Sequence, residues 1–436
     1  MRQVRRLPEH HDSNGWWETL PNAPEPRGVT GEVRVKTAIV GGGICGISVA
    51  NRLSELCPND DICLIEAERV GFGASGRNAG FMLNLHSHGP PKNLDVLRRN
   101  MKFWQTGLDS LRNKVEEWQI QCDWNDSGRF YGAAGPDGEK RLSEISATLE
   151  ALGLHHDRQD RGEIAKRIGT EFYSSALCVP GSALVNPAAM MRGLARNLPA
   201  NVQLFENTPV VSFARENDGY RIVTQQGQIQ TDRLVLATGV FLKDFGIATG
   251  KFVPMATYAS LTNPLDPESL RNLGTGEEFG LLGGSEVGST VRLTRDNRLF
   301  LRNHYNFEPG KSASAARISD IATMHRKALT IRWPALSSIG FEHSWGGAMA
   351  FTTNNGTVFG EYGPNLYAIL TNDVSPMTRG EATGALLAEH MEGLDSDLLS
   401  LQLALPDARR LPPRPFLDAG ISMRRWLKNA TSGREV

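Results

Sequence analysis

The chain has 436 residues, of which 40% are hydrophobic and 22% are charged, and its formal net charge is −1. A chain of this length is expected to fold as two packed units, and a net charge this close to zero gives no field that attracts nucleic acid or an anionic membrane. No apolar run is long enough for a transmembrane helix or a signal peptide. The five cysteines, odd in number and without metal-ligand spacing, indicate a reduced compartment, so we expect a cytoplasmic protein without a metal site.

The predicted elements begin after a polar, proline-rich arm over residues 1–33, which two neighbouring tryptophans are expected to anchor. Residues 36–66 contain a β-branched run, a glycine turn, a helical apolar pattern and a second apolar run, and so predict a βαβ unit. Residues 91–160 have helical periodicity and are predicted to form helices. The strand-like runs within residues 201–370 are too numerous for one Rossmann half, so an inserted antiparallel sheet is expected.

Gly41, Gly43 and Gly46 form the pattern G-x-G-x-x-G between the first predicted strand and its helix. Gly41 would permit the tight turn, Gly43 the approach of a pyrophosphate to backbone N–H groups, and Gly46 the close packing of helix and strand. Glu66 follows Gly46 by 20 residues, at the end of the next strand, where its carboxylate would accept hydrogen bonds from ribose hydroxyls. The pattern predicts a dinucleotide site at a helix N-terminus and disfavours NADP, because an acid repels a 2′-phosphate.

The segment GFGASGRNAGF, residues 71–81, favours FAD over NAD as the dinucleotide. It contains four glycines and only two side chains with a charge or an amide, Arg77 and Asn78. A loop this bare suits a large flat ring that lies against the backbone. Arg77 is expected to hydrogen-bond FAD or the loop that covers it, and a direct substrate role is the alternative.

These motifs, with SNGWWETLP, ALVNPAAMMRGLA and SWGGAMAFTTNNGTVFG, resemble the D-amino-acid oxidase, glycine oxidase and sarcosine oxidase superfamily of flavoproteins. Within that superfamily the γ-glutamylputrescine oxidase-like branch is the most similar, over about residues 14–420. The resemblance implies an FAD-dependent amine or amino-acid oxidase or dehydrogenase, in which a hydride passes from the carbon beside an amine nitrogen to flavin N5 and the imine is hydrolysed. Oxygen or another acceptor would take the electrons; the amine, the acceptor and the oligomeric state stay open.

The resemblance implies an α/β fold with an α+β second domain, in which an antiparallel-sheet substrate domain interrupts a Rossmann-type FAD-binding domain. The expected segments are an arm over 1–33, the FAD-binding domain over 34–90, 161–247 and 340–403, the substrate domain over 91–160 and 248–339, and a tail over 404–436.

Carried over by position, the FAD contacts fall in five groups of residues. They are Gly41, Gly43, Ile44, Cys45 and Gly46; Glu66 and Ala67; Gly73, Ala74, Ser75, Arg77, Asn78 and Ala79; Val210, Thr238 and Gly239; and Ser375, Pro376, Met377 and Thr378. Val210 would offer backbone atoms to adenine, and the last group would bring a helix N-terminus to the flavin edge. This last group departs from the family, because residues 371–376 read TNDVSP where relatives commonly read GFSGHG. Relatives attach flavin through a late cysteine or a histidine in the loop after the ribose acid; this chain has neither, so noncovalent FAD is expected.

The substrate candidates come from the inserted sheet. Arg302 would clamp a carboxylate, His304 and His343 would keep the amine neutral, and Tyr258 and Trp345 would form aromatic walls. For each the alternative is structural: a surface arginine, hydrogen-bonded histidines and core aromatics. Sarcosine-type oxidases place a lysine near flavin N5, and no lysine lies between residues 251 and 311, which weakens the case for an oxidase and leaves a dehydrogenase with another acceptor open.

Two further functions stay open. An NAD-linked flavin reductase would need a second G-x-G-x-x-G between a strand and a helix, and GTGEEFG at 274–280 does not follow a clear strand. A flavoprotein with a non-catalytic assembly or binding role would retain the cofactor fold, and the altered TNDVSP segment makes this alternative worth testing.

Overall fold

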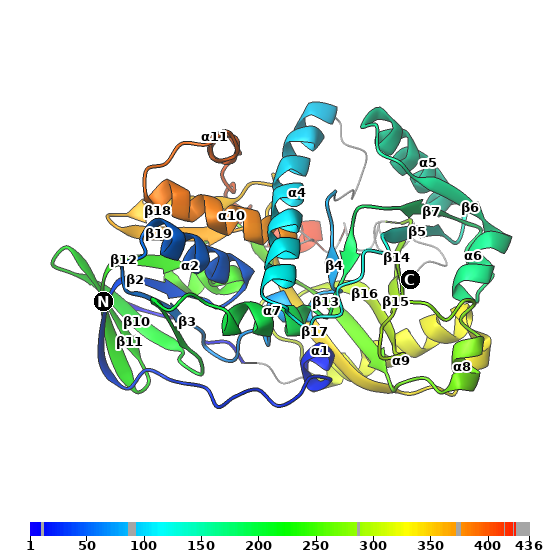
Figure 1. Cartoon of the computed structure of the whole chain (residues 1–436), viewed down its shortest axis with the longest axis horizontal. Coiled ribbons are helices and arrows are strands. Elements are labelled where there is room, and N and C mark those ends of the chain that lie inside the picture. Colours follow the sequence, from blue (N-terminus) through cyan, green and yellow to red (C-terminus); the bar gives the residue numbers. More distant parts are fainter. Residues whose placement is uncertain are drawn as a thin grey trace.

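The computed structural model describes residues 1–9, 13–85, 93–285, 288–371, 376–413, 415–421 and 423. Within these residues the strands form a nine-stranded sheet, an eight-stranded sheet and a two-stranded pair of β4 (Phe81–Met82) and β8 (Ala183–Leu184). Figure 1 shows the two large sheets toward opposite ends of an elongated molecule, with helix α4 (Leu94–Glu117) between them. None of the helices in the described part of the chain is both long and apolar enough to span a membrane.

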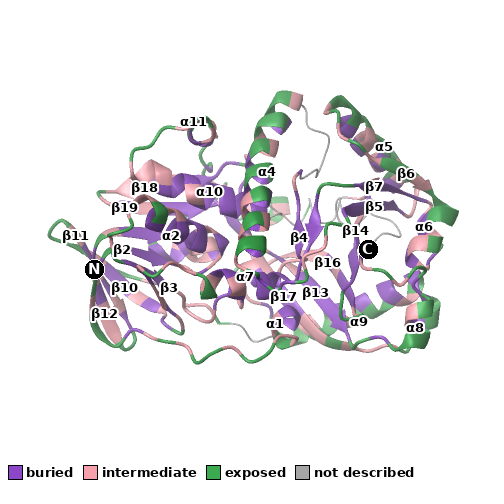
Figure 2. Ribbon diagram, viewed as in Figure 1, coloured by how far each residue is buried: buried purple, intermediate pink, exposed green. Residues whose placement is uncertain are grey.

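The nine-stranded sheet is built on a parallel core in the order β9, β3, β2, β12 and β19. These strands are β2 (Gly31–Val40), β3 (Ile62–Ile65), β9 (Val202–Phe205), β12 (Gly227–Leu236) and β19 (Leu366–Leu370). All four residues of β3, ICLI, are buried, as expected for a parallel strand that is covered on both faces. Figure 2 shows β3 in the buried colour, and the last four residues of β2 are buried as well, whereas exposed residues gather on the outer helix faces and loops.

Antiparallel strands extend this core at one edge. Strands β10 (Val210–Glu216) and β11 (Gly219–Thr224) form a meander with β12, β1 (Arg2–Gln3) pairs with β10, and β18 (Val358–Gly363) pairs with β19. The first half of β12 pairs with β11, and its last residues pair with β19 instead. The carboxyl end of β12 therefore lies within the parallel core.

Helices cover one face of this sheet. They include α2 (Ile44–Leu56), which follows β2, α7 (Pro187–Arg196), and α10 (Pro376–Met391), which follows β19. Helix α4 packs on α10 so closely that a Cβ atom on Gly107 would lie 1.8 Å from the carbonyl oxygen of Thr378. The predicted βαβ unit is thus formed by β2, α2 and β3.

The eight-stranded sheet is antiparallel except for one pair, β14 with β5. In sheet order its strands are β17 (Phe341–Phe351), β13 (Val253–Thr262), β16 (Leu299–Phe307), β15 (Thr290–Leu293), β14 (Phe279–Gly283), β5 (Arg129–Ala133), β7 (Ser175–Val179) and β6 (Asp157–Asp160). Helix α9 (Ala315–Arg332) packs on β13, β16 and β17. The remaining helices are α1 (Gly15–Glu18), α3 (Ala74–Arg77), α5 (Pro136–Ala151), α6 (Arg161–Ile168), α8 (Pro267–Arg271), α11 (Asp397–Leu403), η1 (Gly239–Phe245) and η2 (Pro334–Leu336).

The strand pairing corrects one expectation from the sequence and bears on the placement of two strands. Residues 91–160 are not helical throughout, because the short runs of β5 and β6 pair with β7, a long-range contact that helical periodicity does not reveal. Strands β7 and β17 pair in the eight-stranded sheet, although the expected boundaries place 161–247 and 340–403 in the FAD-binding domain.

Candidate functional site

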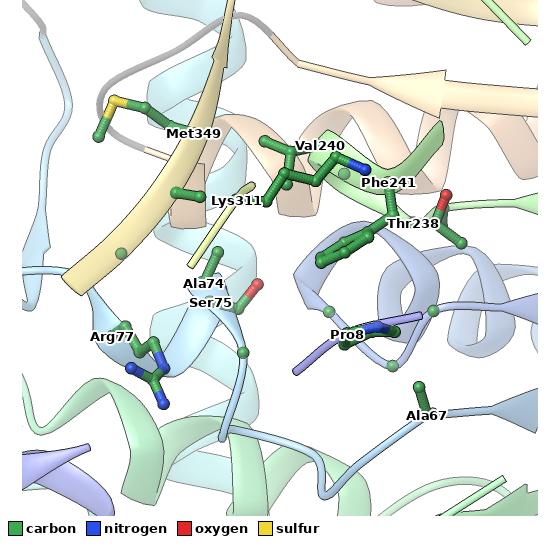
Figure 3. Close-up of a pocket in the computed structure, with 18 of the residues that line it drawn as sticks. Pro8, Ala67, Ala74, Ser75, Arg77, Thr238, Val240, Phe241, Lys311 and Met349 are labelled. Carbon is green, nitrogen blue, oxygen red and sulfur yellow. The ribbon is translucent and has the colours of Figure 1, made fainter. Parts of the chain in front are cut away.

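A cavity of about 290 Å³ is lined by both sheets. One wall is formed where the chain leaves the carboxyl ends of β2, β3, β12 and β19, the edge at which open α/β sheets bind ligands. The other wall comes from β13, β16 and β17 of the eight-stranded sheet. Figure 3 shows side chains from both walls pointing toward the same space.

Most of the residues predicted from the sequence meet at this cavity. Those that line it are Gly41, Gly43, Ile44, Cys45, Glu66, Ala67, Gly73, Ala74, Ser75, Arg77, Asn78, Ala79, Val210, Thr238, Gly239, Arg302, Trp345 and Pro376. The predicted residues that do not line it are Gly46, Tyr258, His304, His343, Met377 and Thr378. Ser375 lies outside the described residues, as do the three residues before it.

The glycine turn after β2 has the geometry that the motif requires. Gly41 has a φ of +111°, and a Cβ atom there would lie 2.4 Å from the carbonyl oxygen of Ala237. A Cβ atom on Gly46 would lie 1.9 Å from the carbonyl oxygen of Gly41. Gly46 therefore lets α2 pack against the turn from behind, while Gly43 and the first turn of α2 face the cavity.

Glu66 lies at the end of β3 with its carboxylate turned toward the glycine turn. Its Oε2 accepts a hydrogen bond from Gly42 N at 2.8 Å, and its Oε1 accepts one from Glu68 N at 3.0 Å. Burial raises the pKa of this carboxyl to about 7, and the two backbone donors oppose that shift. The carboxylate keeps further acceptor sites for ribose hydroxyls, the role expected from the sequence.

Arg77 holds the bare loop to its surroundings. The side chain is 4% exposed, and its Nε donates to Phe72 O at 2.7 Å within the loop. Its Nη1 donates to Gly346 O of β17 at 3.0 Å and to Ser13 O of the arm at 3.4 Å. Figure 3 shows the guanidinium pointing away from Lys311. The charge of Arg77 is therefore used on backbone carbonyls, although its stem lines the cavity.

The other polar side chains of the loop also bond backbone groups. Asn78 Nδ2 donates to Ser75 O at 2.6 Å, and Asn78 Oδ1 accepts from Gly80 N at 2.9 Å. Ser75 Oγ accepts from Ile44 N at 3.0 Å, which ties the loop to the start of α2. The loop is thus fixed by its own side chains, and its glycine backbone is left facing the cavity.

Arg302 and Trp345 reach the cavity from the eight-stranded sheet. Arg302 Nη1 donates to Tyr305 Oη at 2.5 Å, and the guanidinium lies 5.3 Å from the centre of the Tyr305 ring. Trp345 is 1% exposed, and its Nε1 donates to Arg77 O at 3.1 Å. Trp345 therefore joins the sheet to the loop as well as lining the cavity.

Tyr258 and His304 lie on the opposite face of this sheet and do not line the cavity, so the structure does not bring them together with the other predicted site residues. Thr257 pairs with Tyr305 while Tyr258 pairs with Asn303, so His304 is the extra residue of a β-bulge, with a φ of +57°. The His304 ring stacks on a buried histidine of α9. Tyr258 Oη donates to a glutamate, Glu308, at 2.7 Å on that same face.

His343, Met377 and Thr378 also lie away from the cavity. A Cβ atom on Gly15 of α1 would lie 3.0 Å from His343 Cβ, so α1 packs directly against this histidine. Met377 and Thr378 are each 1% exposed, and Thr378 Oγ1 donates to Leu83 O at 2.9 Å. The first turn of α10 is therefore directed at its packing neighbours, and Pro376 is the residue of that turn that lines the cavity.

Lys311 is a cavity residue that the sequence did not reveal. It is 4% exposed, its Nζ forms an ion pair with Asp244, and it lies 4.4 Å from the centre of the Phe241 ring. Burial lowers the pKa of its ammonium to about 7, and the nearby cations Lys243 and Arg6 act in the same direction. No local motif marks Lys311, because it reaches the cavity from the loop between β16 and α9.

The cavity fits the FAD that the sequence implies. Thr238 Oγ1 is buried at its wall without a hydrogen-bond partner among the described residues, and so leaves a donor for a ligand oxygen. Within the part of the chain that the structure describes, Cβ atoms on Gly73 and Gly239 would meet no neighbouring atom within 4 Å, so the backbone there is open to a ligand. Cys45 also lines the cavity, and burial raises the pKa of its thiol to about 12, which keeps it protonated.

Comparisons with known proteins agree with this assignment. A family model described as FAD dependent oxidoreductase matches residues 36–390. The probable oxidoreductase OrdL of Haemophilus influenzae is 24% identical over 380 residues, which cover 83% of this chain and 83% of that protein. The gamma-glutamylputrescine oxidoreductase of Escherichia coli is 24% identical over 372 residues, which cover 81% of this chain and 83% of that protein. The crystal structure of glycine oxidase from Bacillus cereus matches with a TM-score of 0.69 at 18% identity, covering 87% of this chain and all (100%) of that one, and confirms the predicted fold class.

Proposed function

The chain belongs to the family of FAD-dependent oxidoreductases, as its motifs predicted, and we propose that it oxidises the carbon–nitrogen bond of a small amine or amino acid that carries a carboxylate. Two relatives support the substrate class, since γ-glutamylputrescine and glycine each contain an amine and a carboxylate. The observation that carries the proposal is Arg302, which faces the cavity from β16, across from the dinucleotide turn.

Arg302 has the properties of a carboxylate clamp. A guanidinium offers paired N–H donors that match the two oxygens of a carboxylate. Its bond to Tyr305 and the stacking on that ring hold the group in one orientation. Among the ion pairs of the described residues none includes Arg302, so its charge is available to a substrate.

The protein contributes binding and the protonation state of the substrate. Bound FAD supplies the two-electron acceptor: a hydride leaves the carbon beside the amine nitrogen while the nitrogen lone pair forms the C=N bond. The amine must be neutral for this, because a protonated amine has no lone pair. The apolar wall formed by Trp345, Ala348 and Met349 disfavours an ammonium ion through desolvation. Water then adds to the imine and releases a carbonyl compound and an amine or ammonia.

Lys311 favours oxygen as the acceptor of the electrons. The gap in lysines between residues 251 and 311 weakened the case for an oxidase, but Lys311 itself lines the cavity. A cation near the flavin would stabilise the negative charge that oxygen gains. Asp244 offsets part of this charge, so a dehydrogenase with another acceptor is the second candidate.

Anaerobic mixing of the FAD-loaded protein with a panel of amines tests the proposal. The panel pairs secondary amines, amino acids and polyamine conjugates that carry a carboxylate with their amides or decarboxylated analogues. Carboxylate-bearing amines should bleach the flavin absorbance, and their neutral analogues should do so at least about tenfold less efficiently. Oxygen consumption on the same panel distinguishes an oxidase from a dehydrogenase.

The variant Arg302→Met should lose the preference for carboxylate-bearing amines over their neutral analogues. The variant Tyr258→Phe, on the opposite face of the same sheet, should retain that preference. Bleaching by NADH alone would indicate a flavin reductase instead. If no amine on the panel bleaches the flavin, the proposed oxidation is wrong and a binding role becomes the better account.

A further inference from the structure

The N-terminal residues 2–8, here called the strap, form part of the wall of the FAD cavity. The strap residues that line it are Val4, Arg6, Leu7 and Pro8. In the view of Figure 3, Pro8 appears between Phe241 and Ala67, and all three residues line the cavity. The sequence predicted only an arm with anchoring tryptophans here, so a contribution to the cofactor site was not expected.

The strap is held to the nine-stranded sheet at its start. Val4 N donates to Val211 O of β10 at 2.9 Å, directly after the cavity-lining residue Val210. Arg5 N donates to Asp244 O of η1 at 3.2 Å. These two bonds lay the strap across the start of β10 and across η1, the segment that follows β12.

The far end of the strap is held by the other part of the molecule. Arg6 Nη1 donates to Gly310 O at 3.0 Å, in the loop that also supplies Lys311. The strap therefore runs from the β10 edge to the loop between β16 and α9 and joins elements that belong to different sheets. Its residues cross the cavity from one part to the other.

The next described residues of the arm bond the bare loop, residues 71–81, which also lines the cavity. Asn14 Nδ2 donates to Gly71 O and to Gly76 O, each at 3.2 Å, and Trp16 Nε1 donates to Asn78 O at 2.9 Å. Both ends of the bare loop are thus fixed by the arm. The arm contacts the cofactor cavity on two sides, through the strap and through this loop.

We propose that the strap is a movable wall of the FAD site, which retains bound FAD and detaches when FAD enters or leaves. Its attachments are few: the paired strand β1 has two residues, and Arg2, Gln3, Arg5 and Arg6 are exposed. Val4 packs at the edge of the core, so detachment would disturb little of the buried interior. A segment with few buried contacts and a short strand opens at low free-energy cost.

Deleting residues 2–8, with Met1 retained, tests this role without any amine substrate. FAD-free protein is titrated with FAD by fluorescence, and the release rate is measured after dilution into a flavin trap. We expect the dissociation constant and the release rate to rise about tenfold or more, equivalent to about 1.4 kcal/mol. The unfolding midpoint of the FAD-free protein should stay at the wild-type value.

Two point variants refine the test. Val4→Pro removes the N–H that bonds Val211 and should shift FAD release in the same direction as the deletion. Gln3→Ala is the matched control, because this exposed side chain bonds Met1, next to the strap, and Gln3 does not line the cavity. Wild-type FAD affinity and release in the deletion would overturn the proposal. So would a lower midpoint of the FAD-free deletion protein, which would make the strap a structural element.

Discussion

Replacing Gly46 with alanine should weaken both the fold and the binding of FAD. The added Cβ atom would lie 1.9 Å from the carbonyl oxygen of Gly41, whereas Cβ atoms keep at least 3.0 Å from such atoms. Helix α2 and the glycine turn must therefore separate by about 1 Å, and overpacking of this kind costs about 1–3 kcal/mol. If the same amount, about 1–3 kcal/mol, is lost from the free energy of FAD binding because the turn is distorted, the dissociation constant of FAD rises about 5- to 150-fold.

The assay compares the unfolding midpoint of the FAD-free protein with its FAD dissociation constant by fluorescence titration. Gly28→Ala is the matched control, because a Cβ atom there would be 3.5 Å from its nearest neighbour and Gly28 does not line the cavity. The control should match the wild type in both measurements. A Gly46→Ala protein with a wild-type midpoint and wild-type affinity would refute the close approach of α2 to the turn.

Three more predictions concern the walls of the cavity. Burial raises the pKa of the Glu66 carboxyl from 4.5 to about 7. Between pH 4.5 and pH 7 the folded FAD-free protein therefore keeps a proton on Glu66 that the unfolded chain has lost. Its unfolding midpoint should therefore fall as the pH rises from 4.5 to 7, and Glu66→Gln should flatten this dependence. Arg77→Ala should lower the midpoint, because each buried carbonyl left without its donor costs about 1–3 kcal/mol, and Arg77→Lys should not restore it. In steady-state assays His304→Ala should leave kcat/KM for a carboxylate substrate within about twofold of the wild type, whereas Tyr305→Phe should raise KM because Arg302 loses its partner.

The glycine turn and the ribose acid could be predicted from the sequence because their geometry is local. Gly41 must adopt a positive φ, and the residue that ends the next strand must lie beside the turn once both strands are parallel. The run of glycines after Glu66 likewise predicts a backbone open to a ligand. Each of these requirements follows from spacing within about 40 residues.

The substrate wall could not be predicted in the same way, because it depends on one residue of register. Without a bulge, strand alternation would place His304 on the same face as Arg302. The extra residue turns His304 toward α9 and brings Tyr305 to the cavity instead. The bulge is visible only in the pairing of β16 with β13, and the sequence gives no sign of it. Lys311 was missed for a related reason, since a loop between distant elements brings it to the site.

Arg77 shows why a single long side chain belongs in a loop that is otherwise bare. A glycine-rich backbone that faces a ligand has no side chains of its own to hold it, and loops of this kind are mobile. The buried guanidinium bonds the loop to itself, to β17 and to Ser13 of the arm, so the charge acts behind the loop and the front stays clear. The bond to Ser13 couples this part of the N-terminal arm to the cavity, and a change in the arm that breaks this bond should alter FAD binding without touching FAD.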